Sequence, residues 1–542
     1  MGVPAQYFAQ DGRRKYVKLE GAKYVSQEST PATAARRDKS AQAPAHALRL
    51  LEKVRKASEA RHAKAAASET DKAPAPHAVV VGGGIAGLVA ARDLRQSGHE
   101  VTVLEAGESF GGCVRTTEVA GLDIDAGAES FAVRQGTVAN YLDELDLAGQ
   151  IAKTSGKSAW MIQADDQQIL AHPMPATALM GIPADVRTDE VRNIIGRAAT
   201  VRATADLITP MSKKWATEKL SIAEAVRTRM GQAVLDQLVA PVVNGVYSTD
   251  PAKISIDAAA PGLRQAMQET GSLAKAVAQL QASAPAGSRV GGLNGGMYTM
   301  VQALVQQLEA DGAALVRNSP VTAISYDAAA VMPYALASLG EEIRADRVVI
   351  ATPAAPALEL INPLLGDEKK IGAEQPANSI ALAILVVDKP ELDDAPRGSG
   401  VLVSKQAPLT AKALTHSTAK WPWLADEAGP GTHVLRLSFG RIGEHEPVVE
   451  SGDDEQLIDV AIKDASKILG VQLHRDDVLG SAVSRFSDMV PLQGDAALER
   501  RKQLETALAP FDGLAVVGAW ISGTGLARVI GQARRAVAIS AR

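Results

Sequence analysis

Short apolar runs separated by amphipathic segments recur along most of the chain and predict its elements. Residues 78–81 (AVVV) and 101–104 (VTVL) are rich in β-branched side chains, and residues 88–95 between them have helical character. Short apolar runs of this composition are typical of buried strands. Residues 78–104 are therefore predicted to form a strand–helix–strand unit with parallel strands.

Similar patterns predict further elements in the order expected of an α/β protein. The apolar runs at residues 379–387 and 434–439 are predicted to belong to a second sheet, and residues 514–537 to form a strand, a glycine loop and a helix. Other predicted strands are residues 160–169, 321–324 and 347–351, and predicted helices are residues 137–147, most of 186–240, 295–311 and 452–470.

The glycine spacing after the first predicted strand indicates a dinucleotide site. Gly82, Gly84 and Gly87 form a GxGxxG pattern, and Glu105 ends the second strand, 18 residues after Gly87. The first glycine permits a tight turn, the second a close approach to a pyrophosphate and the third close helix packing. The helix N-terminus attracts phosphate, and Glu105 can accept hydrogen bonds from a ribose. A glycine-rich turn in another α/β protein is the alternative, but strand, glycines, helix, strand and acid all occur in order.

The composition is that of an ordinary soluble enzyme with more than one domain. The 542 residues are 46% hydrophobic and carry a net charge of −5. Cys113 is the only cysteine, so no intrachain disulfide can form and a reducing compartment is expected. No Cys/His group has zinc-ligand spacing, so no metal is expected. No window of 18 apolar residues occurs, so we expect no membrane-spanning helix. We also expect a cytoplasmic location and no nucleic-acid partner.

Residues 1–76 differ from the rest of the chain. They contain 15 basic and 8 acidic residues, are rich in Ala, Ser, Gln and Pro, and are predicted to form a disordered basic extension. Within it, Ala47, Leu50, Leu51 and Val54 share one helical face with basic residues around it. Such a helix suits peripheral contact with an anionic membrane or with a partner protein. The interpretation that we prefer is a helical stretch in a solvated tail.

Several motifs together resemble the FAD-dependent protoporphyrinogen/coproporphyrinogen oxidase family within the amine-oxidase superfamily, and most of all its Gram-positive bacterial coproporphyrinogen III oxidase type. The resemblance spans residues 78–537. HPMPATALMGIP and VNGVYSTDPAKISI are the most specific motifs, because wider amine-oxidase relatives lack them. The motifs are GGCVRT (111–116), DAGAESFAVR (125–134), HPMPATALMGIP (172–183), VNGVYSTDPAKISI (243–256), KWPW (420–423) and GAWISGTGLARVI (518–530).

The resemblance implies a fold of class α/β, with a Rossmann-type FAD-binding domain, an α+β substrate-binding domain and a small helical domain. The FAD-binding domain would be discontinuous. The implied boundaries are 77–150, 287–375 and 485–542 for the FAD-binding domain, 151–175, 241–286 and 376–484 for the substrate-binding domain, and 176–240 for the helical domain.

The resemblance also implies which residues contact FAD and the substrate. Arg134 would meet a propionate of the substrate, with an exposed surface arginine as the alternative. No catalytic acid or base is nominated. The implied FAD contacts are Gly82, Gly83, Gly84, Ile85, Ala86, Gly87 and Leu88 for the pyrophosphate, Glu105 and Ala106 for the ribose, Gly112 and Arg115 for a phosphate, Val321 for the adenine, and Gly127, Ala128, Glu129, Ser130, Phe486, Gly525, Leu526 and Ala527 for the flavin side.

The implied reaction is the oxidation of coproporphyrinogen III to coproporphyrin III, with oxygen as acceptor and hydrogen peroxide as product. A second GxGxxG pattern, which is common in flavin reductases that also bind NAD(P)H, is missing. We therefore do not expect a nicotinamide nucleotide to reoxidise the flavin. The alternatives are a protoporphyrinogen oxidase, an amine oxidase or desaturase of the same fold, and a non-enzymatic flavin-bearing partner in haem synthesis. The chain departs from the family at Gln135, Phe486 and residues 491–495, which affects the expected substrate contacts.

Overall fold

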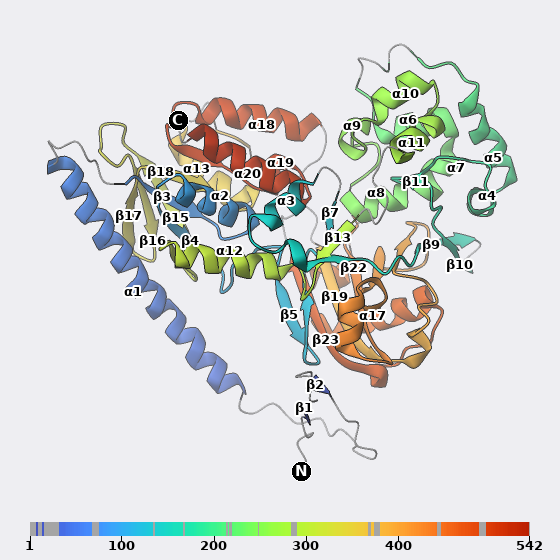
Figure 1. Cartoon of the computed structure of the whole chain (residues 1–542), viewed down its shortest axis with the longest axis horizontal. Helices are drawn as coiled ribbons and strands as arrows, with labels where there is room; N and C mark the ends of the chain where they lie inside the picture. Colours follow the sequence, from blue (N-terminus) through green and yellow to red (C-terminus); the bar gives the residue numbers. More distant parts are fainter. Residues whose placement is uncertain are drawn as a thin grey trace.

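A computed structural model of the chain describes most of its residues (Figure 1). An α/β domain, a second sheet and a helical block form separate regions of the molecule. In the part of the chain that is described, no helix is long and apolar enough to cross a membrane. The described residues are 7–8, 14–15, 32–67, 75–133, 136–165, 168–212, 215, 219–247, 249–282, 290–366, 370–372, 380–441, 446–486 and 495–540.

A parallel five-stranded sheet forms the centre of the first domain. Its strand order is β14-β4-β3-β18-β24, and the predicted strand–helix–strand unit is confirmed as β3, α2 and β4. Consecutive residues of a strand point to opposite faces, so Val80 packs against the helices while Val79 and Val81 pack on the other face. The strands are β3 (His77–Val81), β4 (Glu100–Leu104), β14 (Ala314–Val316), β18 (Arg347–Ile350) and β24 (Leu514–Val516).

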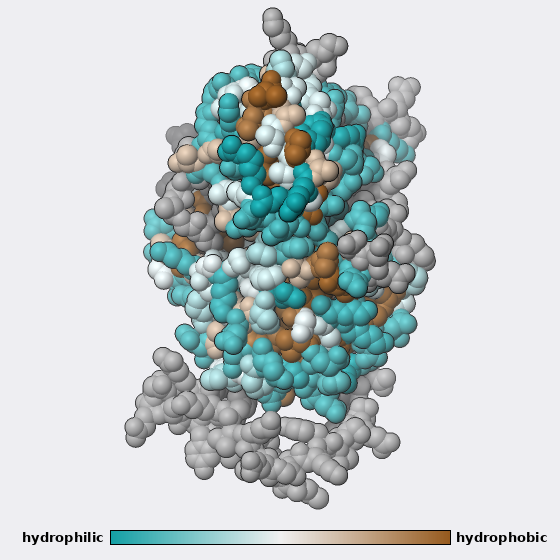
Figure 2. All heavy atoms as spheres, turned by 90° about the vertical axis from the view of Figure 1, so that its right-hand side faces the viewer, coloured by the Kyte–Doolittle hydropathy of each residue, from teal (hydrophilic) through white to brown (hydrophobic). Residues whose placement is uncertain are grey.

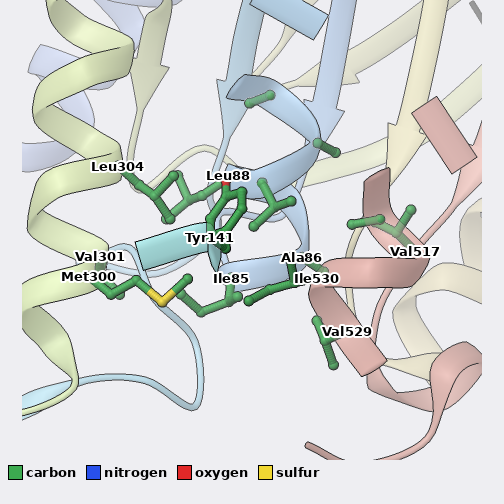
Figure 3. Close-up of a cluster of buried hydrophobic side chains, with 14 of the residues drawn as sticks. Ile85, Ala86, Leu88, Tyr141, Met300, Val301, Leu304, Val517, Val529 and Ile530 are labelled. Atoms are coloured by element: carbon green, nitrogen blue, oxygen red, sulfur yellow. The ribbon is translucent and has the colours of Figure 1, made fainter. Parts of the chain in front are cut away.

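Helices cover one face of this sheet and a three-stranded meander covers the other. Figure 3 shows Ile85 and Ala86 of α2 lying between Met300 of α12 and Ile530 of α20. The helices are α2 (Ile85–Gln96), α3 (Thr137–Asp143), α12 (Tyr298–Ala310) and α20 (Leu526–Ser540); the meander is β15 (Val321–Tyr326), β16 (Tyr334–Ser338) and β17 (Glu341–Ala345), with α13 (Ala354–Ile361), α18 (Asp495–Leu508) and α19 (Ala519–Ser522) nearby.

The second sheet has seven strands in the order β10-β9-β20-β21-β22-β19-β23. Helix α17 (Asp454–Leu469) packs on one face, and the hairpin β5–β6 packs on part of the other. The strands are β9 (Ala159–Asp165), β10 (Gln168–Pro173), β19 (Ile380–Asp388), β20 (Gly400–Val403), β21 (Ala413–His416), β22 (Thr432–Phe439) and β23 (Val478–Phe486), with β5 (Thr116–Val119), β6 (Leu122–Asp125), α14 (Ser417–Lys420), α15 (Pro422–Ala428) and α16 (Pro447–Glu450) beside them. Three short strands, β7 (Phe131–Ala132), β13 (Val290–Leu293) and β8 (Ile151–Lys153), form a further sheet.

The helical block has its own hydrophobic core, which extends over residues 182–277. Residues 241–286, which the sequence boundaries give to the substrate-binding domain, contribute α9, α10 and α11 to this core. The elements are β11 (Ala178–Leu179), β12 (Ile182–Pro183), α4 (Asp189–Ile195), α5 (Arg197–Thr204), α6 (Ile222–Met230), α7 (Gln232–Val234), the π-helix η4 (Leu235–Val239), α8 (Ala240–Tyr247), α9 (Ile256–Ala259), α10 (Leu263–Thr270) and α11 (Leu273–Ala282).

Helix α1 (Ala32–Ala67) contains the predicted helix, but its apolar face is not solvated, which corrects the interpretation that we preferred. It runs beside β17 (Figure 1), and Ala47, Leu51 and Val54 are buried in the core that also contains the meander. The Ser58 hydroxyl donates to the Arg344 carbonyl (2.8 Å). The predicted apolar face is therefore covered by the protein itself and is not free to bind a lipid surface. The rest of the extension lies largely outside the described residues, except the short paired strands β1 (Tyr7–Phe8) and β2 (Arg14–Lys15).

We predict that Leu51→Ala destabilises the protein by about 2–5 kcal/mol, because it leaves a cavity at a fully buried position. Leu48→Ala, on the same helix, is the control: Leu48 is 40% exposed, so its truncation should change stability by less than about 0.5 kcal/mol. Urea unfolding followed by circular dichroism measures both. Equal midpoints for the two variants would show that α1 does not stabilise the domain.

Candidate functional site

The GxGxxG loop has the geometry that a pyrophosphate site requires. Gly82 has φ +101°, and a Cβ at Gly87 would lie 2.0 Å from the Gly82 carbonyl oxygen, so both positions need glycine for the turn and for helix packing. Gly84 is different: a Cβ there would have Gly112 Cα, 4.0 Å away, as its nearest protein neighbour. The space in front of Gly84 is therefore open, which suits close approach of a ligand.

The Gly111–Gly112 pair lies directly against the GxGxxG loop. The Gly111 N–H donates to the Gly83 carbonyl (2.8 Å), and Gly112 has φ +61°. Because neither Gly84 nor Gly112 has a side chain, the two adjoining backbones border an open space, here called the glycine slot, that a Cβ would begin to fill. The residues present therefore fit a nucleotide pyrophosphate. The structure brings together the two glycine motifs predicted to meet it.

Glu105 fastens the glycine loop to the segment that follows β4. Its carboxylate accepts from the Gly83 N–H (2.7 Å) and from the Gly107 N–H (2.7 Å). Each carboxylate oxygen retains lone-pair sites for a further donor such as a ribose hydroxyl. The predicted residue thus also holds the loop in place, a role that the motif spacing did not reveal.

Val321 and Arg115 are the residues predicted to contact the adenine and a phosphate. The Ser319 N–H donates to the Glu105 carbonyl (2.8 Å), which brings the start of β15, and with it Val321, beside Glu105. The Arg115 guanidinium lies 4.7 Å from the centre of the Phe486 ring. This stacking places the aromatic residue predicted for the flavin side next to the arginine predicted for a phosphate.

The segment from Gly127 to Ser130 is packed tightly against the second glycine motif. A Cβ at Gly127 would lie 2.0 Å from the Cys113 carbonyl oxygen, and the Ala128 N–H donates to the same oxygen (2.9 Å). Only glycine fits at Gly127, so this segment follows the glycine slot at short range.

Glu129 links this segment to the second sheet. Its carboxylate accepts from Lys420 on α14 and from Arg436 on β22, and Arg436 also donates to the Gly127 carbonyl (2.5 Å). Burial acts to raise the pKa of Glu129, but the two cations outweigh it and lower the pKa to about 2. The sequence analysis missed Lys420 and Arg436 as partners, although Lys420 begins the KWPW motif.

We predict that this ion-pair cluster makes stability sensitive to acid. The folded-state pKa of Glu129 is depressed from 4.5 to about 2, so its contribution of about 3 kcal/mol is complete above pH 4.5 and is lost as the pH falls toward 2. Urea unfolding at a series of pH values should show Glu129→Gln less stable than the wild type at pH 7, with the difference shrinking below pH 4.5. Glu118→Gln, at an exposed position, is the control. A difference that stays constant with pH would contradict the prediction.

Asp125 is a second, half-buried carboxylate near this segment that the sequence analysis did not assign. It accepts from the Met297 N–H (2.9 Å) at the start of α12, and a Cβ at Gly296 would lie 3.0 Å from its Oδ1. Burial raises the pKa of Asp125 to about 6. Its role in the structure is to fix the N-terminus of α12 beside Gly127.

The N-terminus of α20 provides the last predicted group of residues. Gly525 has φ +104° and an open side, and the first helical hydrogen bonds run from the Arg528 and Val529 N–H groups back to the Gly525 carbonyl. The N–H groups of Leu526 and Ala527 precede them, at the positive end of the helix dipole. This end of α20 is thus suited to an electron-rich ligand atom.

The remaining predicted contact residues differ in their burial, and some of them lie outside the described residues. Ile85, Ala86 and Leu88 are buried in the core, so their backbone rather than their side chains faces the glycine loop. Ala106 is exposed, and Ser130 is half-buried. Arg134, Gln135 and residues 491–494 lie outside the described residues. Among the residues that are described, no group of three or more metal-ligating side chains occurs.

Comparison with known proteins agrees with this geometry. The sequence of a coproporphyrinogen III oxidase from Mycobacterium leprae is 30% identical over 462 residues, which cover 84% of this chain and 96% of the relative. A coproporphyrinogen III oxidase from Bacillus subtilis is 26% identical over 482 residues, covering 85% of this chain and 97% of the relative. A crystal structure from Exiguobacterium sp., provisionally assigned as a protoporphyrinogen oxidase, superimposes with a TM-score of 0.74 at 25% identity, covering 86% of this chain and 99% of the other.

A family profile described as "Flavin containing amine oxidoreductase" matches residues 85–539, which is most of the chain and includes Gly87, the Gly111–Gly112 pair, Glu129 with its two cations, and α20. The amine-oxidase-type α/β fold expected from the sequence is confirmed. The chain is an oxidoreductase that belongs to the flavin-containing amine oxidoreductase family.

Proposed function

We propose that the protein binds FAD without a covalent bond and oxidises coproporphyrinogen III to coproporphyrin III. The observation that carries the flavin part is the open space beside Gly84 and Gly112, where both glycines present bare backbone. The substrate part is supported by the coproporphyrinogen III oxidases that match this chain over nearly their whole length. Oxygen as acceptor and hydrogen peroxide as product complete the proposal.

The residues of this chain would hold the cofactor in an extended arrangement. The backbone at Gly82 to Leu88, with Gly112 and Arg115, would bind the pyrophosphate, Glu105 and Ala106 the ribose, and Val321 the adenine. Gly127 to Ser130, Phe486 and Gly525 to Ala527 would border the flavin ring. Bound there, the flavin supplies a two-electron acceptor, while the protein supplies position, electrostatics and exclusion of water.

The experiment that tests this proposal separates cofactor from substrate. Protein purified without added flavin is denatured by heat, and the released flavin is identified as FAD or FMN. The native protein is then assayed by porphyrin fluorescence with coproporphyrinogen III and with protoporphyrinogen IX, which is the alternative substrate. We expect FAD and preference for coproporphyrinogen III, with hydrogen peroxide formed in proportion to the oxidation. Release of FMN, or turnover of neither substrate, would refute the proposal.

For Arg134 we predict a role in binding the substrate. Arg134→Ala should raise KM for the porphyrinogen and lower kcat/KM roughly ten- to a hundredfold, the effect of losing one charge-assisted hydrogen bond of about 1.5–3 kcal/mol, with FAD content unchanged. Arg134→Lys should recover only part, because an ammonium cannot form the forked pair with a carboxylate. A porphyrinogen esterified at its carboxylates is the control, since it should be turned over equally by wild type and variant. Equal losses on ester and free acid would assign Arg134 to the fold instead.

A further inference from the structure

A cavity of about 250 Å³, separate from the glycine motifs, lies where the helical block meets the seven-stranded sheet. Residues of α6, α7, η4 and α8 form one wall, and the turn after β20 with the end of β22 forms the other. Figure 2 faces the side of the molecule to which these two regions belong, and its surface is mostly hydrophilic with separate apolar patches. None of the residues assigned above to the flavin lines this cavity.

The cavity carries more positive than negative charge. Four cationic residues line it, against two acidic residues, Asp236 and Asp250. Both acids already accept hydrogen bonds within their own segment: Asp236 from Gln232 (2.7 Å) and Asp250 from the Ala252 N–H (2.8 Å). The cations are Arg227, Lys405, Lys412 and Arg441.

The cations on the sheet side are held in place by backbone carbonyls. Lys412 is 4% exposed and donates to the Gly440 carbonyl (3.0 Å). Arg441 donates to the Thr410 and Ala411 carbonyls (2.7 and 2.9 Å) and forms an ion pair with Glu446 (3.9 Å), which offsets part of its charge. On the helical side, Arg227 Nε donates to the Gln232 side chain (3.0 Å). An anion between the two walls would meet fixed charges from both.

The rest of the lining combines the polar side chains of Gln232, Asn244 and Gln406 with small apolar residues. Small aliphatic side chains lie among the cations. A ligand that contains methylene groups would bury those groups against these side chains. The π-helix η4 and Pro241 shape this wall: Pro241 lacks an N–H, and the Gln237 carbonyl accepts from Gln163 Nε2 instead (3.3 Å). The apolar lining residues are Ala223, Leu235, Ala240, Pro241 and Ala252.

We infer that this cavity binds carboxylate groups carried on a short aliphatic chain. Two sources have this chemistry: a free aliphatic dicarboxylate, or a propionate side chain of a porphyrin, and the second rests on the proposed function. Asn244 lines the cavity, and the next residue, Gly245, packs so closely on Leu402 of β20 that a Cβ would lie 2.7 Å from Leu402 Cδ2. A carboxylate bound in the cavity would therefore lie where α8 packs against the seven-stranded sheet.

Calorimetric titration of the flavin-loaded protein tests the inference. The probes are glutarate, its uncharged analogue glutaramide, coproporphyrin III and the tetramethyl ester of coproporphyrin III. Arg227→Gln and Lys405→Gln remove one cation from each wall at exposed positions, and Lys463→Gln, an exposed lysine on α17, is the matched control. Flavin absorbance is recorded throughout to show that the flavin site is unchanged.

We expect Arg227→Gln and Lys405→Gln each to weaken binding of an acid probe about tenfold or more, while Lys463→Gln leaves it unchanged. Binding of glutarate but not glutaramide identifies a free dicarboxylate site. An effect of the two variants on coproporphyrin III alone, absent with its ester, identifies a propionate site. If neither acid binds, or if the variants bind both acids like the wild type, the inference is overturned. Glutarate binding without porphyrinogen turnover would refute only the proposed function.

Discussion

Gly84→Val is expected to give a protein that folds normally and retains no FAD. Gly84 has φ −70°, which valine tolerates, and a Cβ there has no protein atom closer than 4.0 Å. The substitution therefore does not strain the chain. Its side chain instead occupies the slot opposite Gly112, where the proposed pyrophosphate needs direct contact with backbone N–H groups.

The ratio of flavin to protein absorbance in the purified variant, before and after incubation with excess FAD, measures this loss. Thermal unfolding followed by circular dichroism shows separately that the variant is folded. Gly149→Val is the matched control, because a Cβ at Gly149 also meets no protein atom within 4 Å and the residue is exposed far from the glycine slot in sequence. Full flavin occupancy in folded Gly84→Val would remove this loop from the cofactor site.

Asp206→Ala is expected to destabilise the helical block by about 3–5 kcal/mol, because it leaves the buried Arg229 guanidinium without its counter-ion. Asp206 is completely buried and Arg229 is 2% exposed. The Asp206 carboxylate accepts from Arg229 Nε (2.5 Å), the Ser272 hydroxyl (2.6 Å) and the Leu273 and Ala274 N–H groups. Three parts of the block, which are distant in sequence, meet at this one carboxylate.

Urea unfolding monitored at 222 nm tests this prediction, with Asp189→Ala as the control. Asp189 lies in the same block, and its side chain is 78% exposed in an ion pair with Arg192, so its loss should cost less than about 1 kcal/mol. The double variant Asp206→Ala/Arg229→Met should regain part of the stability, because it no longer buries an unpaired charge. If Asp206→Ala unfolds at the same urea concentration as Asp189→Ala, the buried pair does not hold the block together.

The strand–helix–strand unit was predictable because its information is local. Residues 78–105 carry the strand pattern, the glycines, the helix and the acid within one short segment, and the structure folds this segment as predicted into β3, α2 and β4. The requirement for glycine at Gly82 and Gly87 is equally local, since it arises from backbone conformation and from contact between neighbouring elements. The family motifs extended this information to Gly112, Gly127 and Gly525.

Helix α1 shows what the local sequence pattern could not predict. The periodicity of Ala47, Leu51 and Val54 identified the helical face, but the surface that covers this face belongs to the sheets formed by residues 77–104 and 314–350. An amphipathic pattern states that a face is apolar and does not state whether solvent, lipid or protein contacts it. Only the packing of distant strands decided that the protein itself covers it.

By itself, the sequence determined the α/β class, the parallel strand–helix–strand unit and the glycine positions, because each depends on side chains and backbone torsions within a few residues. The tertiary structure decided what needs residues far apart in the chain. Glu129 is joined to Lys420 and Arg436 across about 300 residues, and the cationic cavity forms only where the helical block meets the second sheet. Local sequence cannot specify such contacts, since electrostatic and packing energies depend on distance in space rather than on distance along the chain.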